Sequence, residues 1–251
     1  MSGKFTTTEL DCADFIHSAA KPGAQFDGKE RVGPAFSLPL MQQAQQKAWL
    51  ALQAIQQALK PGISEAAAVL LGKEILQAHG AQRLWHPVII RFGVNTTKTY
   101  DEPSDRSICL AEDDIVFIDI GPVFEGHEAD VGATFVLGQD EEKQRCADAA
   151  ALIFQQVRQR WLDLGLTGEA LYQYAEQLCS ALGYQLNLAI KGHRLSDFPH
   201  KLYQGGNLGD FSGQPRPGVW VLEIQLKHPS LPYGAFYEDV LLETDFEPAV
   251  C

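Results

Sequence analysis

Four acidic residues lie inside or beside apolar, β-branched segments, where carboxylates are uncommon. Asp119 stands between two isoleucines in IVFIDIG, and Glu223 stands between a leucine and an isoleucine in VWVLEIQL. Asp130 and Glu238 follow them by 11 and 15 positions, respectively. A buried carboxylate is unfavourable unless it is paired or binds a metal. Any one of these residues could simply face solvent, but four that converge would form a site of hard oxygen ligands, suited to manganese, magnesium, iron(II) or zinc.

Histidines offer the complementary ligand type. His193 and His200 occur in the run KGHRLSDFPHK, between the two acidic pairs, where a glycine and a proline indicate a loop or strand edge. Four carboxylates and one imidazole fit a two-metal site in which carboxylates bridge both ions. His86, His127 and His228 are interpreted as ordinary surface residues.

The helices and strands that would position these groups are predicted twice along the chain, in a similar order. Ser64 and Thr167 can each begin a helix, and Gly80 and Gly183 can each follow one; both pairs are 103 positions apart. Asp119 and Glu223 are separated by nearly the same shift, 104 positions. We therefore expect an α+β fold of two similar halves related by a pseudo-twofold axis, although helix–glycine patterns also recur by chance. Helices are predicted at about 38–59, 64–79, 141–164 and 168–182, and strands in PVIIRFG, IVFIDIG, VGATFVLG, YQLNLAI, VWVLEIQL and FYEDVLLE.

Composition narrows the class of protein. The 251 residues include 45% hydrophobic and 21% charged residues, with a formal net charge of −12, which argues against a nucleic-acid binder. No segment approaches a membrane span, and no secretory signal is visible. Five scattered cysteines favour reduced thiols and a cytoplasmic location. We expect an N-terminal arm at residues 1–36 and one domain at 37–251.

The ordered set Asp, Asp, His, Glu, Glu resembles the dinuclear pita-bread metallopeptidases: methionine aminopeptidase, aminopeptidase P, prolidase and the related creatinase. The resemblance covers residues 39–243, and residues 93–138 are similar to the family's first metal motif almost throughout. It implies the pita-bread fold, with two α+β halves around a central antiparallel sheet, and two divalent metal ions. Manganese is expected first, with cobalt, zinc or iron(II) as alternatives.

The resemblance also implies a role for each ligand. Asp119 would bind one metal, Asp130 and Glu238 would bridge both, and His193 and Glu223 would bind the other. Glu223 would in addition act as general base and acid. The histidine that stabilises the tetrahedral oxyanion in the family corresponds to His200.

The substrate-contacting residues differ from the family pattern. The histidine that the family places shortly before Pro103 is absent, and Tyr100 is the best local match. An acidic residue usually follows the second histidine, whereas this chain has Lys201. A lysine would repel a free α-amino group and favour a substrate carboxylate.

These observations predict a metal-dependent hydrolase, of the aminopeptidase P or prolidase type, that cleaves a peptide or related amide near the N-terminus of a short substrate. A catalytically impaired binding module with the same fold and a creatinase-like hydrolase of a non-peptide amide are the alternatives. The expected partner is the short peptide or amide, with no nucleic acid and no membrane; a homodimer is left open.

Overall fold

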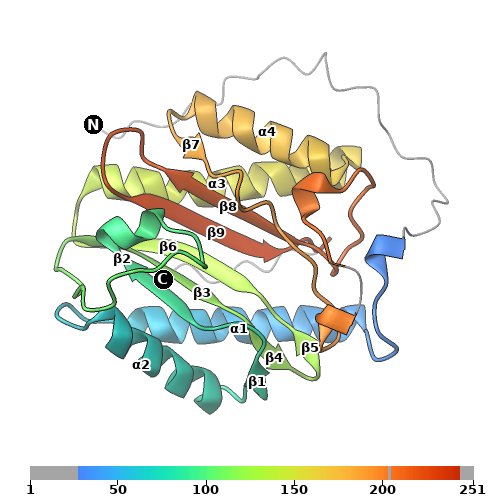
Figure 1. Ribbon diagram of the computed structural model, residues 1–251, viewed down its shortest axis with the longest axis horizontal. Coiled ribbons are helices and arrows are strands. Elements are labelled where there is room, and N and C mark those ends of the chain that lie inside the picture. Colours follow the sequence, from blue (N-terminus) through green and yellow to red (C-terminus); the bar gives the residue numbers. More distant parts are fainter. Residues whose placement is uncertain (1–27, 203–204, 244–251) are drawn as a thin grey trace.

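A six-stranded antiparallel sheet in the order β2-β3-β6-β9-β8-β7 forms the centre of the computed structural model, which describes residues 28–202 and 205–243 (Figure 1). The strands of this sheet are β2 (Ile89–Phe92), β3 (Asp114–Ile120), β6 (Val131–Leu137), β7 (Gln185–Leu186), β8 (Val221–Lys227) and β9 (Gly234–Val240). The order is symmetric about the β6–β9 pair. Two three-strand halves therefore meet at the middle of the sheet.

Four helices complete the two halves. These are α1 (Leu38–Ala58), α2 (Glu65–Ala78), α3 (Glu141–Leu164) and α4 (Gly168–Ala181). Each half has the order helix, helix, strand, strand, strand, and Figure 1 shows α1 and α2 beside β2, β3 and β6, with α3 and α4 beside β7, β8 and β9. The predicted α+β class and the duplication are both confirmed.

The helices begin and end where the sequence predicts. The Ser64 hydroxyl accepts a hydrogen bond from the Ala67 N–H, and the Thr167 hydroxyl accepts one from the Ala170 N–H, both at 3.3 Å. These equivalent N-caps satisfy N–H groups that a first helical turn leaves free. One apolar face of α1 is buried through Met41, Ala44, Ala48, Ala51 and Ile55, and Leu59, just after the helix, is buried with it.

The two faces of the sheet have different environments. Ile118 and Ile120 of β3 pack in a core with α1 and α2, and Leu222 and Ile224 of β8 pack in a second core with α3 and α4. Because side chains alternate along a strand, the residue between each pair points to the opposite face. The acidic residues of β3 and β8 therefore face away from the helices.

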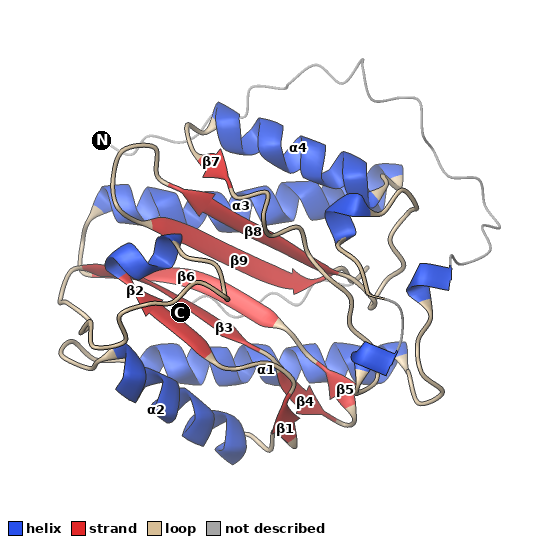
Figure 2. Ribbon diagram, in the orientation of Figure 1, coloured by secondary structure: helices blue, strands red, loops and turns tan. Residues whose placement is uncertain are grey.

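The rest of the described chain consists of short elements and loops. A second antiparallel sheet, in the order β1-β4-β5, was not predicted from the sequence. The segment YQLNLAI, predicted as a strand, forms one only at Gln185–Leu186 as β7, and Figure 2 shows mostly loop between β7 and β8. The additional elements are β1 (Arg83–Leu84), β4 (Pro122–Phe124), β5 (His127–Glu128) and the 3-10 helices η2 (Gly28–Glu30), η3 (Gly93–Thr97), η4 (His200–Leu202) and η5 (Leu208–Asp210).

Part of the predicted N-terminal arm packs on the domain, while residues 1–27 lie outside the described residues. The Glu30 carboxylate is 3% exposed and accepts hydrogen bonds at 2.7 Å from the Trp220 indole and from the Arg216 backbone N–H. The Gly33 N–H donates to the Asp197 carboxylate, also at 2.7 Å. Within the described part of the chain, no helix is long and apolar enough to cross a membrane.

Candidate metal centre

A cavity of about 750 Å³ contains every residue that the sequence analysis assigned to the site. The five predicted metal ligands come from β3, β8, β9, the residue before β6 and the loop after β7. The predicted oxyanion donor and substrate-contacting residues share the same lining. The complete set is Tyr100, Asp119, Asp130, His193, His200, Lys201, Glu223 and Glu238.

Strand register brings three of the carboxylates into one row. Asp119 of β3 pairs with Gly132 of β6, Gly132 pairs with Glu238 of β9, and Glu238 pairs with Glu223 of β8. Directly paired residues of an antiparallel sheet have their side chains on the same face. The three carboxylates therefore project from the cavity face across four adjacent strands, although they are far apart in sequence.

Gly132 creates space in the middle of this row. A Cβ atom at this position would lie 2.6 Å from Cε1 of Phe236 and 2.8 Å from Oε1 of Glu238. Both distances are shorter than van der Waals contact. A side chain at residue 132 would thus displace the Glu238 carboxylate, and its absence keeps the centre of the row open.

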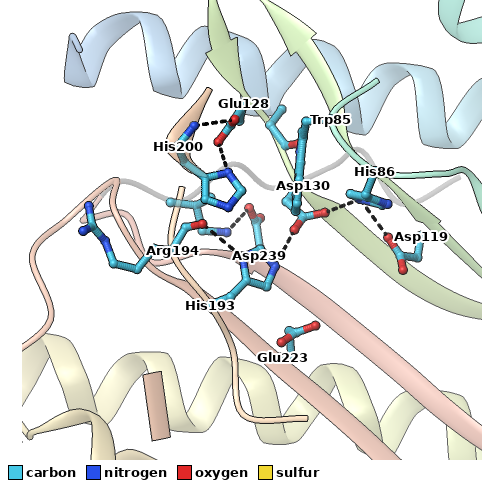
Figure 3. Close-up of polar contacts among 12 residues, drawn as sticks. Trp85, His86, Asp119, Glu128, Asp130, His193, Arg194, His200, Glu223 and Asp239 are labelled. Carbon is cyan, nitrogen blue, oxygen red and sulfur yellow. Dashed lines mark hydrogen bonds and ion pairs between the residues drawn. The ribbon is translucent and has the colours of Figure 1, made fainter. Parts of the chain in front are cut away.

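Asp130 lies above the row, immediately before β6, with its side chain 2% exposed. Oδ2 of Asp130 is 2.9 Å from Nε2 of His193, and Oδ1 is 3.1 Å from Nε2 of His86 (Figure 3). Its backbone N–H and C=O are both bound at 2.8 Å by the amide side chain of Gln45 in α1. These two hydrogen bonds fix the backbone of Asp130, and with it the carboxylate, relative to α1.

The ionised forms of the three carboxyl groups in the row are unfavourable, because the groups are buried close together. Burial raises the pKa of the Asp119 carboxyl to about 6 and that of the Glu223 carboxyl to about 7. Burial and the neighbouring carboxylates raise the pKa of Glu238 well above its ordinary value. A site that disfavours charge on this scale needs compensating positive charge.

The imidazoles supply part of that charge. Burial alone would raise the pKa of Asp130, but hydrogen bonds from His193 and His86 lower it. In turn, the nearby carboxylates outweigh the effect of burial on the imidazoles, raising the pKa of His193 to about 10 and that of His86 to about 9.

Two carboxylate oxygens still lack a hydrogen bond. Among residues 28–202 and 205–243, Oδ1 of Asp119 and Oε1 of Glu238 are buried without a hydrogen-bond partner. Buried acceptors without a partner are uncommon in native structures, where a protein group, an ordered water or an ion satisfies them. Carboxylate and imidazole groups are also the donor types that divalent transition metals take. The residues present therefore fit a metal centre.

His200 lies at the edge of the site, where Glu128 holds it in position. Its Nδ1 is 2.6 Å from Oε2 of Glu128, and its backbone N–H donates to Oε1 of the same carboxylate at 2.9 Å. The Trp85 ring lies edge-on to three imidazoles, with centroid distances of 4.4 Å to His86, 5.3 Å to His193 and 5.2 Å to His200. Trp85 thus packs among the histidines that surround the carboxylates.

The sequence interpretation missed three residues of this site: Trp85, His86 and Glu128. His86 was interpreted as a surface residue, and the structure corrects this by placing it against Asp119 and Asp130. His127, interpreted in the same way, is buried, and its Nε2 accepts a hydrogen bond from the Ser37 N–H at 2.8 Å. No periodic pattern marks these positions, because each lies in a loop or a two-residue strand.

The chain is similar in sequence to known peptidases. Residues 39–228 match the sequence model of metallopeptidase family M24. The chain is 29% identical to methionine aminopeptidase 2 of Bacillus subtilis (strain 168) over 161 residues, which cover 61% of this chain and 63% of that protein. It is 25% identical to the putative dipeptidase YkvY of the same organism over 223 residues, covering 82% of this chain and 60% of that protein.

The fold also resembles that of known structures. The crystal structure of the prolidase from Pyrococcus horikoshii OT3 superposes with a TM-score of 0.66 at 18% identity, covering 81% of this chain and 58% of that one. The chain thus spans about three fifths of the length of these relatives. The family match extends over most of the described residues and includes four of the five predicted ligands. The chain therefore belongs to metallopeptidase family M24.

Proposed function

We propose that the protein is a metal-dependent hydrolase of the aminopeptidase P and prolidase type, which cleaves a peptide or related amide bond near the N-terminus of a short substrate. The observation that carries this proposal is the row of three carboxylates across four strands, with Asp130 and His193 directly above it in one cavity. Membership of a metallopeptidase family supports the same reaction class.

Two divalent ions would be held by the five carboxylate and imidazole ligands. Asp119 would bind one ion, His193 and Glu223 the other, and Asp130 and Glu238 both. Such ions would act as Lewis acids that polarise the scissile carbonyl and supply a nucleophile at neutral pH. Manganese is the first candidate, with cobalt, zinc and iron(II) as alternatives.

Glu223 would transfer protons in this reaction. The Glu223 carboxyl group lines the cavity beside the proposed ions, where it could accept a proton and return it. The Tyr172 hydroxyl donates to the Glu223 C=O at 2.9 Å and accepts a hydrogen bond from the Glu223 N–H at 3.2 Å. These contacts fix the backbone that carries the carboxyl group.

His200 would donate a hydrogen bond to the oxyanion that forms as the carbonyl is attacked. Donors that are positioned before the reaction stabilise this developing charge without reorganisation. The buried Glu128 carboxylate holds the imidazole by Nδ1, which leaves Nε2 for the substrate.

Tyr100 and Lys201 would contact the substrate at the cavity entrance. Both line the cavity, and Tyr100 is 74% exposed. A phenol can donate one hydrogen bond in place of the family's histidine. Lys201 adds a positive charge beside the cavity, which supports a substrate with a free carboxylate, such as an Xaa-Pro dipeptide.

The test is a substrate panel with chelated protein reloaded separately with manganese, cobalt, zinc and iron(II). Xaa-Pro dipeptides, Met-peptides and creatine, a non-peptide guanidino compound, are compared by product formation. We expect turnover of Xaa-Pro dipeptides and weak turnover of Met-peptides. Turnover of creatine alone would favour a creatinase-like enzyme. Metal-loaded protein that hydrolyses none of them would contradict the proposal and favour a binding module.

A further inference from the structure

His86 has an environment that the five-ligand scheme does not use. It lies between β1 and β2, and its Nε2 is 3.1 Å from Oδ1 of Asp130 and 3.4 Å from Oδ1 of Asp119 (Figure 3). Its Nδ1 is 2.8 Å from the carbonyl oxygen of the next residue, Pro87. The imidazole therefore bridges a backbone acceptor and two carboxylates of the candidate centre.

His193 makes two similar contacts, one with the other oxygen of Asp130 and one with a backbone carbonyl. Its Nε2 is 2.9 Å from Oδ2 of Asp130, and its Nδ1 is 3.1 Å from the carbonyl oxygen of the next residue, Arg194. The two oxygens of Asp130 thus each face one imidazole. His193, which was predicted as a metal ligand, and His86, which was interpreted as a surface residue, therefore have similar positions relative to Asp130.

The backbone contacts fix which nitrogen of each imidazole is available. A carbonyl oxygen can only accept, so Nδ1 must carry the hydrogen in both His86 and His193. In the neutral ring, Nε2 then has a lone pair that faces carboxylate oxygens, an arrangement that only a cation or a proton between them makes favourable. Histidines that bind metals commonly donate their other ring N–H to a carbonyl or carboxylate in this way.

The packing around His86 holds the ring in this place. A Cβ atom on Gly121 would lie 2.0 Å from Cδ2 and 2.3 Å from Nε2 of His86, so the imidazole occupies space that only a glycine leaves free. The Trp85 indole lies edge-on to the ring and close to the same glycine, since its Nε1 would be 2.6 Å from that Cβ atom, and it donates to the Ala129 carbonyl oxygen at 2.8 Å. The position of Nε2 is therefore set by the fold.

We propose that His86 is a sixth protein ligand, which binds through Nε2 the ion that Asp119 binds and that Asp130 shares. Each of the two ions would then have one imidazole, His86 on one and His193 on the other. This inference rests on the proposed two-metal centre. It predicts a preference for transition metals over magnesium at both positions, because imidazole suits the former and oxygen ligands the latter.

The test is calorimetric titration of chelated protein with cobalt(II), together with the visible absorption of the bound ion, in wild type, His86→Ala and His200→Ala. We expect two ions per chain in wild type. In His86→Ala, the cobalt affinity of one site should fall by about 10- to 100-fold or more, which is the effect of changing residues around a bound metal. The absorption band of the ion at that site should also change. The His200→Ala variant is the matched control, since it removes an imidazole of the same cavity that faces Glu128, and both ions should bind as in wild type.

A second variant separates loss of the ligand from loss of packing. In His86→Gly, added imidazole should restore the weakened cobalt site, while a purely structural role would leave it unrestored. Thermal unfolding of each variant checks that it folds. Two cobalt sites of wild-type affinity in folded His86→Ala would overturn the inference and leave the five-ligand centre intact, indicating that His86 only pairs with the carboxylates as a cation. Fewer than two sites in wild type would overturn the proposed centre itself.

Discussion

Nδ1 of His200 lies 2.6 Å from Oε2 of Glu128, a carboxylate that is 1% exposed. Glu128 also accepts a hydrogen bond from the His200 backbone N–H, so one carboxylate fixes both the ring and the main chain of this residue. The pair lies beside the carboxylate row without taking part in it. Glu128 is therefore a positioning residue for the proposed oxyanion donor.

Glu128→Gln tests this relationship. We expect kcat to fall by about 10-fold or more, less than the roughly 10²–10³ that follows loss of an oxyanion donor itself, because the amide keeps one hydrogen bond but loses the charge. KM and bound metal should stay near their wild-type values. Steady-state kinetics and metal analysis of Glu128→Gln and His200→Ala make the comparison. A Glu128→Gln enzyme with wild-type kcat would show that His200 needs no such support.

Glu223→Gln keeps the size of the side chain and removes both the charge and the proton acceptor. Hydrolysis should fall by about 10² or more, which is the scale of general acid–base assistance, while the fold survives. The rate is measured with metal in excess, so that weaker binding of the ions does not limit it. Glu176→Gln, an exposed change on α4, is the control and should behave as wild type. Unchanged turnover in metal-replete Glu223→Gln would rule out the proton-transfer role.

Metal removal should make stability depend on pH in a defined direction. The pKa of Asp119 is raised from 3.8 to about 6 and that of Glu223 from 4.5 to about 7. The folded metal-free protein therefore binds protons that the unfolded chain has released. The stability contributed by these groups is complete below their ordinary pKa values and is lost as the pH rises through about 7. Bound metal should remove this loss, because it compensates the deprotonated carboxylates.

Urea unfolding at about pH 5 and about pH 7.5, with chelator or with manganese, measures this dependence. The Asp119→Asn variant removes one of the titrating groups and should lose less stability between the two pH values than wild type does. Metal-free wild type that is equally stable at both pH values, or that resembles Asp119→Asn, would be inconsistent with the raised pKa values.

Lys201→Glu tests the proposed preference for a substrate carboxylate. Wild type should cleave Xaa-Pro dipeptides with a higher kcat/KM than the corresponding C-terminal amides, since Lys201 would attract the substrate carboxylate. The substitution should reduce or reverse that ratio. Lys73→Glu makes the same change of charge at an exposed position of α2 and should leave the ratio unchanged. If wild type cleaves the amides as well as the acids, or Lys201→Glu leaves the ratio as it was, this account of specificity is wrong.

Much of the fold could be predicted because its elements carry local signals. Caps at Ser64 and Thr167 and glycines after α2 and α4 mark both helix pairs, and the β-branched runs mark the long strands. The 103-residue shift between the pairs then indicates a duplication. The short strands β1, β4 and β5 could not be found, since two or three residues show no periodicity and depend on tertiary pairing.

The site was predictable to the extent that its residues interrupt a pattern. Asp119 and Glu223 stand out as charges within apolar strands, but Glu128 and His86 interrupt nothing, because their surroundings are loops and short strands. Their positions follow from long-range contacts, such as the close approach of His86 to Gly121 and that of Glu128 to His200. Such contacts form only in the folded chain, so no local sequence pattern predicts them.

A crystal structure of the manganese-loaded protein with anomalous scattering tests whether the five predicted ligands hold two metal ions. Two anomalous peaks are predicted among Asp119, Asp130, His193, Glu223 and Glu238, about 3.5–4 Å apart. Ligand distances should be about 2.0–2.3 Å. Loaded crystals without peaks in the cavity, or with any of the five side chains turned away from the ions, would contradict the two-metal account.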